Sequence, residues 1–214
     1  MTGPLLLGHR GARASRHIPE NTMASFELCL QHGCDGFEFD VRLSADGRAV
    51  ICHDATSGGM SIAMTAAESL GLPALEDVVQ QFATRAFLDI ELKVAGLERQ
   101  AIAALLAHTP QKGFVVSSFL PDVLAAVRDI DSAIPLGFLC DNRDQLRGWR
   151  ETPADWVIPH FKLAEAGLIE QVHAAGNKVM VWTVNRDARI QEFAEWGVDA
   201  IISDETELLV RSRR

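Results

Sequence analysis

The sequence lacks the features of a disulfide-bonded, zinc-finger or membrane-spanning protein. None of its four cysteines belongs to a C-x-x-C pair, which favours free, buried thiols in a reducing compartment over a zinc site or a disulfide framework. No apolar run approaches the length of a membrane span. The N-terminus has three consecutive leucines, Leu5 to Leu7, without a basic segment before them, which is unlike a secretory signal. These absences predict a cytoplasmic protein with no stable membrane association.

Basic residues are in the minority. The chain has 20 Lys and Arg against 29 Asp and Glu, so its formal net charge is -9. A surface of that sign repels nucleic acids and anionic lipid headgroups unless the basic residues gather in a patch. The one basic run, Arg211 with Arg213 and Arg214, is typical of a solvated tail. We therefore expect no nucleic-acid partner.

The chain also has no linker or low-complexity tract to divide it. Its 214 residues, 48% of them apolar, suit one domain over residues 1–214 that buries about 70% of its unfolded surface. Short apolar runs alternate with segments of helical period. The candidate strands begin near Leu5, Gly36, Phe87, Phe114, Leu136, Trp156, Lys178 and Ala200, with an additional extended segment at Ala49–His53.

Eight strand-then-helix units in 214 residues predict a compact (β/α)8 TIM barrel. An open, doubly wound sheet uses the same alternation and is the alternative. The first helix, which contains Met23 and Phe26, has Asn21 or Thr22 as its possible N-cap. In both folds the functional side chains gather at the C-terminal ends of the strands.

Carboxylates are placed where such a site is expected. Glu38 and Asp40 alternate with apolar residues and so share one face of the second strand. Glu91 occupies the equivalent face of the third barrel strand, and Lys93 lies one step nearer the rim. Three carboxylates on adjacent strands form a site of oxygen ligands suited to Mg²⁺ or Ca²⁺. The alternative is an internal salt bridge between the lysine and the carboxylates.

Two histidines follow strand-like runs at the same end. His9 ends the first strand in a His-Arg-Gly turn, which could also be an ordinary exposed turn. His53 ends the additional extended segment, and Asp54 could orient it, so the two histidines suggest an acid–base pair. Trp182, near the rim of the seventh strand, suits either the pocket or the core, and His160 is a possible secondary pocket residue. Asp204 is a possible cap of the last helix.

A series of short motifs runs in order through about 200 residues of the chain. They are His9-Arg10-Gly11, Pro19-Glu20-Asn21-Thr22 with Ser25, Asp35-Gly36, Glu38-x-Asp40-Val41, Asp46-Gly47, His53-Asp54, Glu91-Leu92-Lys93, Ser117-Ser118-Phe119, Trp182-Thr183-Val184-Asn185 and Gly197-Val198-Asp199-x-Ile201-Ile202-x-Asp204. One His-Arg-Gly alone would mean little. The ordered series closely resembles the glycerophosphodiester phosphodiesterase family.

The resemblance implies a (β/α)8 barrel and metal-dependent hydrolysis of soluble glycerophosphodiesters to glycerol 3-phosphate and an alcohol. It implies residue roles that agree with the patterns above. The metal ligands would be Glu38, Asp40 and Glu91, the catalytic acid–base pair His9 and His53, and the phosphate contacts Arg10 and Lys93, with Trp182 as a substrate contact.

The chain departs from the family at Ala55–Pro73. This segment is short, has no Arg-Thr-Thr-like motif and leaves no room for the large inserted subdomain that the family often carries. Because inserted loops shape the pocket mouth, the leaving alcohol stays open. Two alternative functions also stay open: a phospholipase acting on lysolipid or inositol lipid headgroups, and a non-catalytic barrel that binds phosphorylated polyols.

Overall fold

Eight parallel strands close into a barrel in the computed structural model, which describes residues 3–212. The eight strands are β1 (Leu5–His9), β2 (Gly36–Leu43), β6 (Phe87–Leu92), β7 (Phe114–Ser118), β8 (Leu136–Cys140), β9 (Trp156–Pro159), β10 (Lys178–Val181) and β11 (Ala200–Ser203). Strand β1 pairs with both β2 and β11, so the predicted barrel is confirmed and the open sheet is wrong. Arg213 and Arg214 of the predicted basic tail lie outside the described residues.

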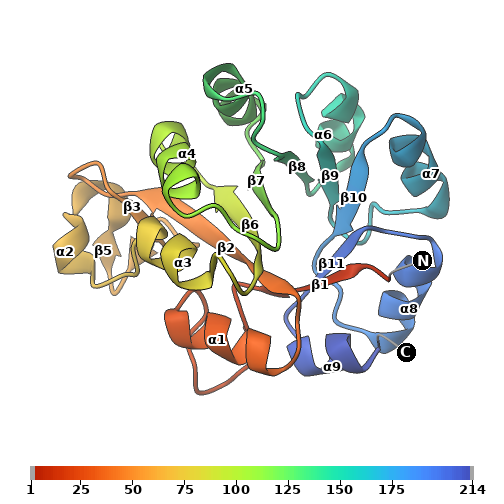
Figure 1. Ribbon diagram of the computed structural model, residues 1–214, viewed down its shortest axis with the longest axis horizontal. Coiled ribbons are helices and arrows are strands. Elements are labelled where there is room, and N and C mark those ends of the chain that lie inside the picture. Colours follow the sequence, from red (N-terminus) through yellow and green to blue (C-terminus); the bar gives the residue numbers. More distant parts are fainter. Residues whose placement is uncertain (1–2, 213–214) are drawn as a thin grey trace.

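Helices surround the strands as an outer ring (Figure 1). They are α1 (Met23–Gln31), α3 (Leu75–Phe82), α4 (Glu98–Ala107), α5 (Pro121–Ile130), α6 (Arg143–Arg147), α7 (Ala166–Ala174), α8 (Asp187–Glu195) and α9 (Thr206–Arg211), with a 3-10 turn, η2 (Gly148–Arg150), after α6. Thr22 is the N-cap of α1, since its side chain accepts a hydrogen bond from the Ser25 amide. Within residues 3–212, no helix is both long and apolar enough to cross a bilayer.

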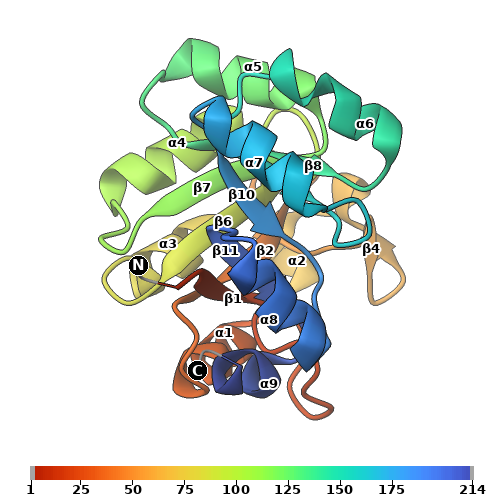
Figure 2. The same ribbon diagram turned by 90° about the vertical axis from the view of Figure 1, so that its right-hand side faces the viewer.

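The barrel closes between its first and last strand-and-helix units. Helix α9 follows β11 and lies beside α1, so the first and last units are neighbours (Figure 2).

The four cysteines are free, and all but Cys52 are buried, in agreement with the expected thiols.

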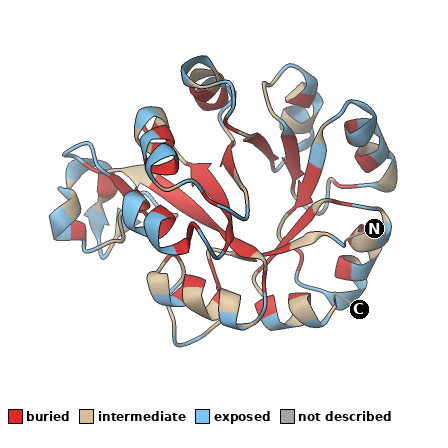
Figure 3. Cartoon of the chain, viewed as in Figure 1, coloured by how far each residue is buried: buried red, intermediate tan, exposed pale blue. Residues whose placement is uncertain are grey.

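The core has two layers because side chains alternate along each strand. Phe37 and Phe39 of β2 point outward and pack against the helices, where Phe37 stacks on Phe26 of α1 with ring centroids 4.3 Å apart. A second cluster that includes Leu7, Val115 and Ile202 fills the barrel interior. Buried residues therefore occupy the strands and the inner faces of the helices (Figure 3). Polar side chains of β2 that point inward must gather inside the barrel.

A short segment between β2 and β6 extends away from the ring (Figure 1). It contains β3 (Ala49–Ile51), the hairpin of β4 (Thr56–Ser57) and β5 (Met60–Ser61), a 3-10 turn, η1 (Ile62–Met64), and α2 (Ala67–Leu70). Strand β3 pairs antiparallel with the end of β2, which brings Ile51 beside Val41. The predicted extended segment is thus confirmed, and it carries His53 to the C-terminal end of the barrel.

Candidate active site

Three carboxylates meet inside the C-terminal end of the barrel. Glu38 and Asp40 point inward from β2, and the register of β2 against β6 pairs Asp40 with Glu91. One oxygen from each of the three lies within 4.8 Å of the others. All three residues are buried, with exposed fractions of 4%, 1% and 6%. The predicted cluster is therefore assembled by strand alternation and by register.

The charge of this cluster is poorly compensated. Burial, together with Asp40 and Glu91, raises the pKa of Glu38 well above its usual range. Burial and Asp40 raise the pKa of Glu91 to about 7. Glu38 Oε1 is buried and has no polar partner among the described residues. Three mutually repelling carboxylates, one of them with an unpartnered buried oxygen, form a donor set that suits a hard divalent cation, so these residues fit a divalent metal ion.

Two cations border the cluster. Lys93 Nζ lies 2.7 Å from Glu91 Oε1 and 3.3 Å from Asp40 Oδ1. Arg10 Nε lies 3.2 Å from Asp40 Oδ2, and Arg10 Nη1 donates to Glu20. Burial alone would raise the pKa of Asp40, but the two cations outweigh burial and lower it. The predicted lysine salt bridge is present, and it leaves Glu38 without a cation of its own.

Asn21 is a site residue that the sequence analysis placed in a motif of the family and considered as a possible helix cap, but to which it assigned no role in the site. It adopts the left-handed backbone conformation with φ +56°. Its buried side chain donates from Nδ2 to Asp40 Oδ2 at 2.8 Å and accepts from the Asp40 amide. The signal available in the sequence was its place in the Pro19-Glu20-Asn21-Thr22 motif. Asn21 therefore fixes the orientation of one of the cluster carboxylates.

His9 is paired with a carboxylate from the other end of the chain. Its Nδ1 lies 2.7 Å from Asp204 Oδ1, while its Nε2 faces Glu38 Oε2 at 3.8 Å. Burial would raise the pKa of Asp204, but hydrogen bonds from His9, Asn185 and Arg13 lower it well below its usual range. The predicted role of Asp204 as a helix cap is wrong, because Glu205 holds the cap position of α9.

His53 has a carboxylate partner of the same kind. Its Nδ1 lies 2.7 Å from Asp54 Oδ1, as the sequence suggested. A carboxylate can only accept, so each histidine carries a proton on Nδ1 and turns Nε2 away from its partner. The His53 side chain is 35% exposed against 12% for His9. The pKa of His53 is lowered, chiefly by burial.

A cavity of about 250 Å³ opens above the cluster, lined by His9, Arg10, Glu38, His53, Glu91, Lys93, Phe119, Leu139, Asp141, Trp182 and Ile202. It contains all the predicted site residues except Asp40, which lies beneath it. The Trp182 indole donates to Ile158 O and meets the Phe119 ring edge-to-face at 5.5 Å. His160 packs against Trp182 with centroids 5.2 Å apart but does not line the cavity. Sequence reasoning missed Asp141 and Phe119 as lining residues.

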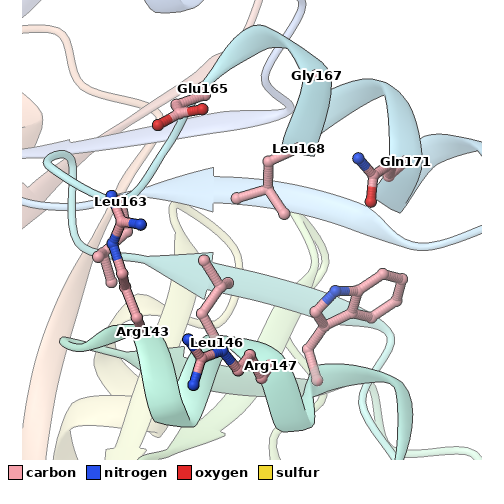
Figure 4. A pocket seen from close by; sticks show the side chains of 9 residues that line it. Arg143, Leu146, Arg147, Leu163, Glu165, Gly167, Leu168 and Gln171 are labelled. Carbon is pink, nitrogen blue, oxygen red and sulfur yellow. The ribbon is translucent and has the colours of Figure 1, made fainter.

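A larger hollow of about 350 Å³ lies outside the barrel, between α6 and α7 (Figure 4). Leucine side chains from both helices line it, with Arg143, Arg147 and Glu165 around them. Its lining contains neither a histidine nor a carboxylate cluster, so this larger hollow is not the candidate active site.

Barrels of this architecture carry their catalytic groups at the C-terminal ends of the strands, where the carboxylates, the paired histidines and the cavity lie. Fold and site together thus define a (β/α)8-barrel enzyme. The chain belongs to the glycerophosphoryl diester phosphodiesterase family, whose model matches residues 9–82 and 73–208. Its activity is accordingly the hydrolysis of glycerophosphodiesters.

Relatives and solved structures agree with this assignment. A glycerophosphodiester phosphodiesterase of Caldanaerobacter subterraneus subsp. tengcongensis is 28% identical over 96% of each chain. One of Bacillus altitudinis is 28% identical over 97% of each chain. A phosphodiesterase of Oleispira antarctica, solved in complex with the product sn-glycerol-3-phosphate, superposes with a TM-score of 0.84 at 27% identity and covers 98% of this chain and 96% of its own.

Proposed function

We propose that this enzyme hydrolyses soluble glycerophosphodiesters to glycerol 3-phosphate and an alcohol, with one divalent cation and two histidines at one site. The observation that carries the proposal is the carboxylate cluster with His9 and His53 around the same cavity. The cavity volume of about 250 Å³ suits a small phosphorylated polyol. The glycerol 3-phosphate bound to the Oleispira antarctica relative supports the same substrate class.

Glu38, Asp40 and Glu91 would hold the cation, and their oxygen ligands suit Mg²⁺ or Ca²⁺. A bound divalent cation supplies positive charge where a phosphodiester gains negative charge in its transition state. Lys93 and Arg10 add charge from the protein side and contact the phosphate. Lys93 retains its proton, because Glu91 and Asp40 outweigh burial and raise its pKa.

His9 and His53 supply the proton transfers. One takes the proton of the attacking oxygen, which belongs to water or to a neighbouring glycerol hydroxyl, and the other protonates the leaving alkoxide. Asp204 and Asp54 hold the proton on Nδ1 of each ring, so Nε2 is the atom that exchanges a proton with substrate. Trp182 and Phe119 offer apolar surface to the glycerol carbons.

The charge of the site argues for a single phosphate group rather than a polyanion. The cations lining the cavity are Arg10 and Lys93, and both are already shared with carboxylates. A net charge of -9 disfavours docking on nucleic acid or an anionic bilayer. A general acid also speeds the cleavage of a phosphodiester, because the leaving group is an alkoxide that must be protonated.

Turnover on a substrate panel tests the proposal. Glycerophosphocholine, glycerophosphoethanolamine, bis(p-nitrophenyl) phosphate, glycerol 3-phosphate and lysophosphatidylcholine micelles are compared with and without EDTA. We expect release of glycerol 3-phosphate from the two glycerophosphodiesters and loss of that release in EDTA. A preference for micellar lipid would instead support a phospholipase, and binding of glycerol 3-phosphate without turnover would support a non-catalytic barrel.

A further inference from the structure

A second cavity lies beside the carboxylate cluster, over the ends of β2 and β6. Its volume is about 340 Å³, and it is lined by the chain after Asp40, the chain after Lys93 and the hairpin segment. Arg42 is its one charged lining residue. The other lining side chains are small or aliphatic apart from two serines, and none is aromatic or acidic.

Arg42 is placed by the same alternation that places the cluster. Glu38, Asp40 and Arg42 share one face of β2, and two residues advance a strand by about 7 Å. The Lys93 amide donates to Val41 O, so Arg42 lies next to Lys93 on the neighbouring strand. The second cavity therefore begins one strand step beyond the groups proposed to hold phosphate.

The guanidinium of Arg42 is available to a ligand. Its Nε donates to His53 O at 2.8 Å, and within residues 3–212 it forms no ion pair. The other arginines and the lysine at this site differ in this respect. Arg10, Arg13 and Lys93 each contact at least two carboxylates. A partly buried guanidinium whose terminal nitrogens have no acceptor suits a carboxylate or a phosphate.

The orientation of the bound diester also points to the second cavity as the site of the leaving alcohol. If the glycerol phosphate occupies the cavity that contains His9 and Trp182, the alcohol on the other side of phosphorus leaves over β2 and β6. Ala55, two residues after His53, lines the second cavity. An alcohol seated there has its leaving oxygen next to His53. A choline group would find neither an aromatic ring nor a carboxylate among the lining residues.

We propose that the Arg42 cavity receives the leaving alcohol and selects alcohols that carry an anionic group, such as the carboxylate of serine. This inference rests on the proposed function and specifies its substrate. The lining offers one cation, Arg42, and a Ser61 hydroxyl that has no side-chain hydrogen bond among residues 3–212, and the other lining side chains are uncharged. The carboxylate would bind Arg42 through its terminal nitrogens, leaving the Nε bond to His53 intact.

Glycerophosphoserine and glycerophosphoethanolamine test it, since the two differ only by a carboxylate. The measured quantity is the ratio of their kcat/KM values. We expect the wild type to prefer glycerophosphoserine and Arg42→Gln to lower the ratio about 10-fold, the scale of a hydrogen bond to a charged group. Arg42→Lys should keep most of the preference. Loss of the His53 O contact would slow both substrates alike, so the ratio is insensitive to it.

A second variant leaves Arg42 intact. Ala63→Asp adds a negative charge to the exposed wall of the cavity and should also lower the ratio. Ser57→Asp adds the same charge on the adjoining hairpin, outside the lining, and should leave both rates unchanged. A ratio that neither Arg42→Gln nor Ala63→Asp alters, or a wild-type preference for glycerophosphoethanolamine, overturns the inference while the proposed function stands. Cleavage of neither compound overturns both.

Discussion

The Nδ1 atom of His9, at the end of the first barrel strand, lies 2.7 Å from Asp204 Oδ1, just after the last strand. The contact spans 195 positions in sequence and exists because β1 pairs with β11. Asn185 donates to the second oxygen of Asp204 and Arg13 to the first, so the carboxylate is held from three sides. Closure of the barrel therefore orients a proposed catalytic histidine.

Replacement of Asp204 by asparagine should lower kcat about 10²-fold with little change in KM, because an amide no longer holds the proton on His9 Nδ1. Steady-state kinetics on glycerophosphocholine measures this. Asp199→Asn is the matched control, since Asp199 also pairs with a histidine, His173, but at the opposite end of β11. Equal kcat values for Asp204→Asn and the wild type would contradict the positioning role.

The two histidines should respond differently to the leaving group. His53→Ala should cost about 10²–10⁴-fold in kcat on glycerophosphocholine, but far less on a glycerophosphodiester whose leaving group is p-nitrophenol. The reason is that a phenolate departs without a proton, whereas an alkoxide needs a general acid, which we here assign to His53. His9→Ala should slow both substrates by similar factors. Equal losses in both variants on both substrates would contradict the placement of His53 on the leaving-group side.

Removal of single carboxylates should abolish metal binding. Glu38→Gln and Glu91→Gln should each lose divalent-metal affinity, measured by isothermal titration calorimetry, together with activity. In EDTA the same variants should unfold at a higher temperature than the wild type, because each removes like-charge repulsion from a buried cluster. Asp40→Asn should instead unfold at a lower temperature, since Arg10 and Lys93 would lose their shared partner. Full activity of these variants in chelator would refute the ligand assignment.

Metal-free protein should lose stability as the pH rises. Burial raises the pKa of Asp89 to about 7, and burial with Asp40 does the same for Glu91. Both groups bind protons more tightly when folded, so their stabilising contribution is complete below about pH 4 and is lost through about pH 7. Asp40 and Asp204, whose pKa values are lowered, titrate below this window.

Urea unfolding in EDTA should therefore show a fall on the order of a few kcal/mol between about pH 5 and about pH 8. Added Mg²⁺ or Ca²⁺ should offset the fall at the higher pH. The lowered pKa of His53 acts in the opposite direction near pH 6, so the difference with and without metal is the quantity to compare. A curve that metal does not alter would contradict the cluster as the metal site.

Closure of β2 against β6 should depend on Gly36. A Cβ at this position would lie 1.8 Å from the Phe87 carbonyl oxygen, which is backbone and pairs with Gly36 in the register. Gly36→Ala should therefore destabilise the fold by more than about 3 kcal/mol. The contrasting variant is Gly167→Ala in α7, where a Cβ meets nothing within 4 Å. It should be stabilising by up to about 1 kcal/mol, and thermal unfolding distinguishes the two.

Local pattern by itself determined the barrel strands, the inward face of Glu38 and Asp40, and the partner of His53. These depend on strand alternation and on residues adjacent in sequence, which act before any tertiary contact forms. The same reasoning left Asp204 and Asn21 as possible helix caps, because short polar residues are favoured at that position.

Only the closed tertiary structure decided where those two side chains bind. Asp204 reaches His9 because the last strand pairs with the first, and Asn21 reaches Asp40 because the chain after β1 turns back over β2. The second cavity depends on how the hairpin segment lies over β2 and β6, which no strand period determines. Contacts between residues far apart in sequence arise from the packing of the whole barrel. A pattern of neighbouring residues therefore does not predict them.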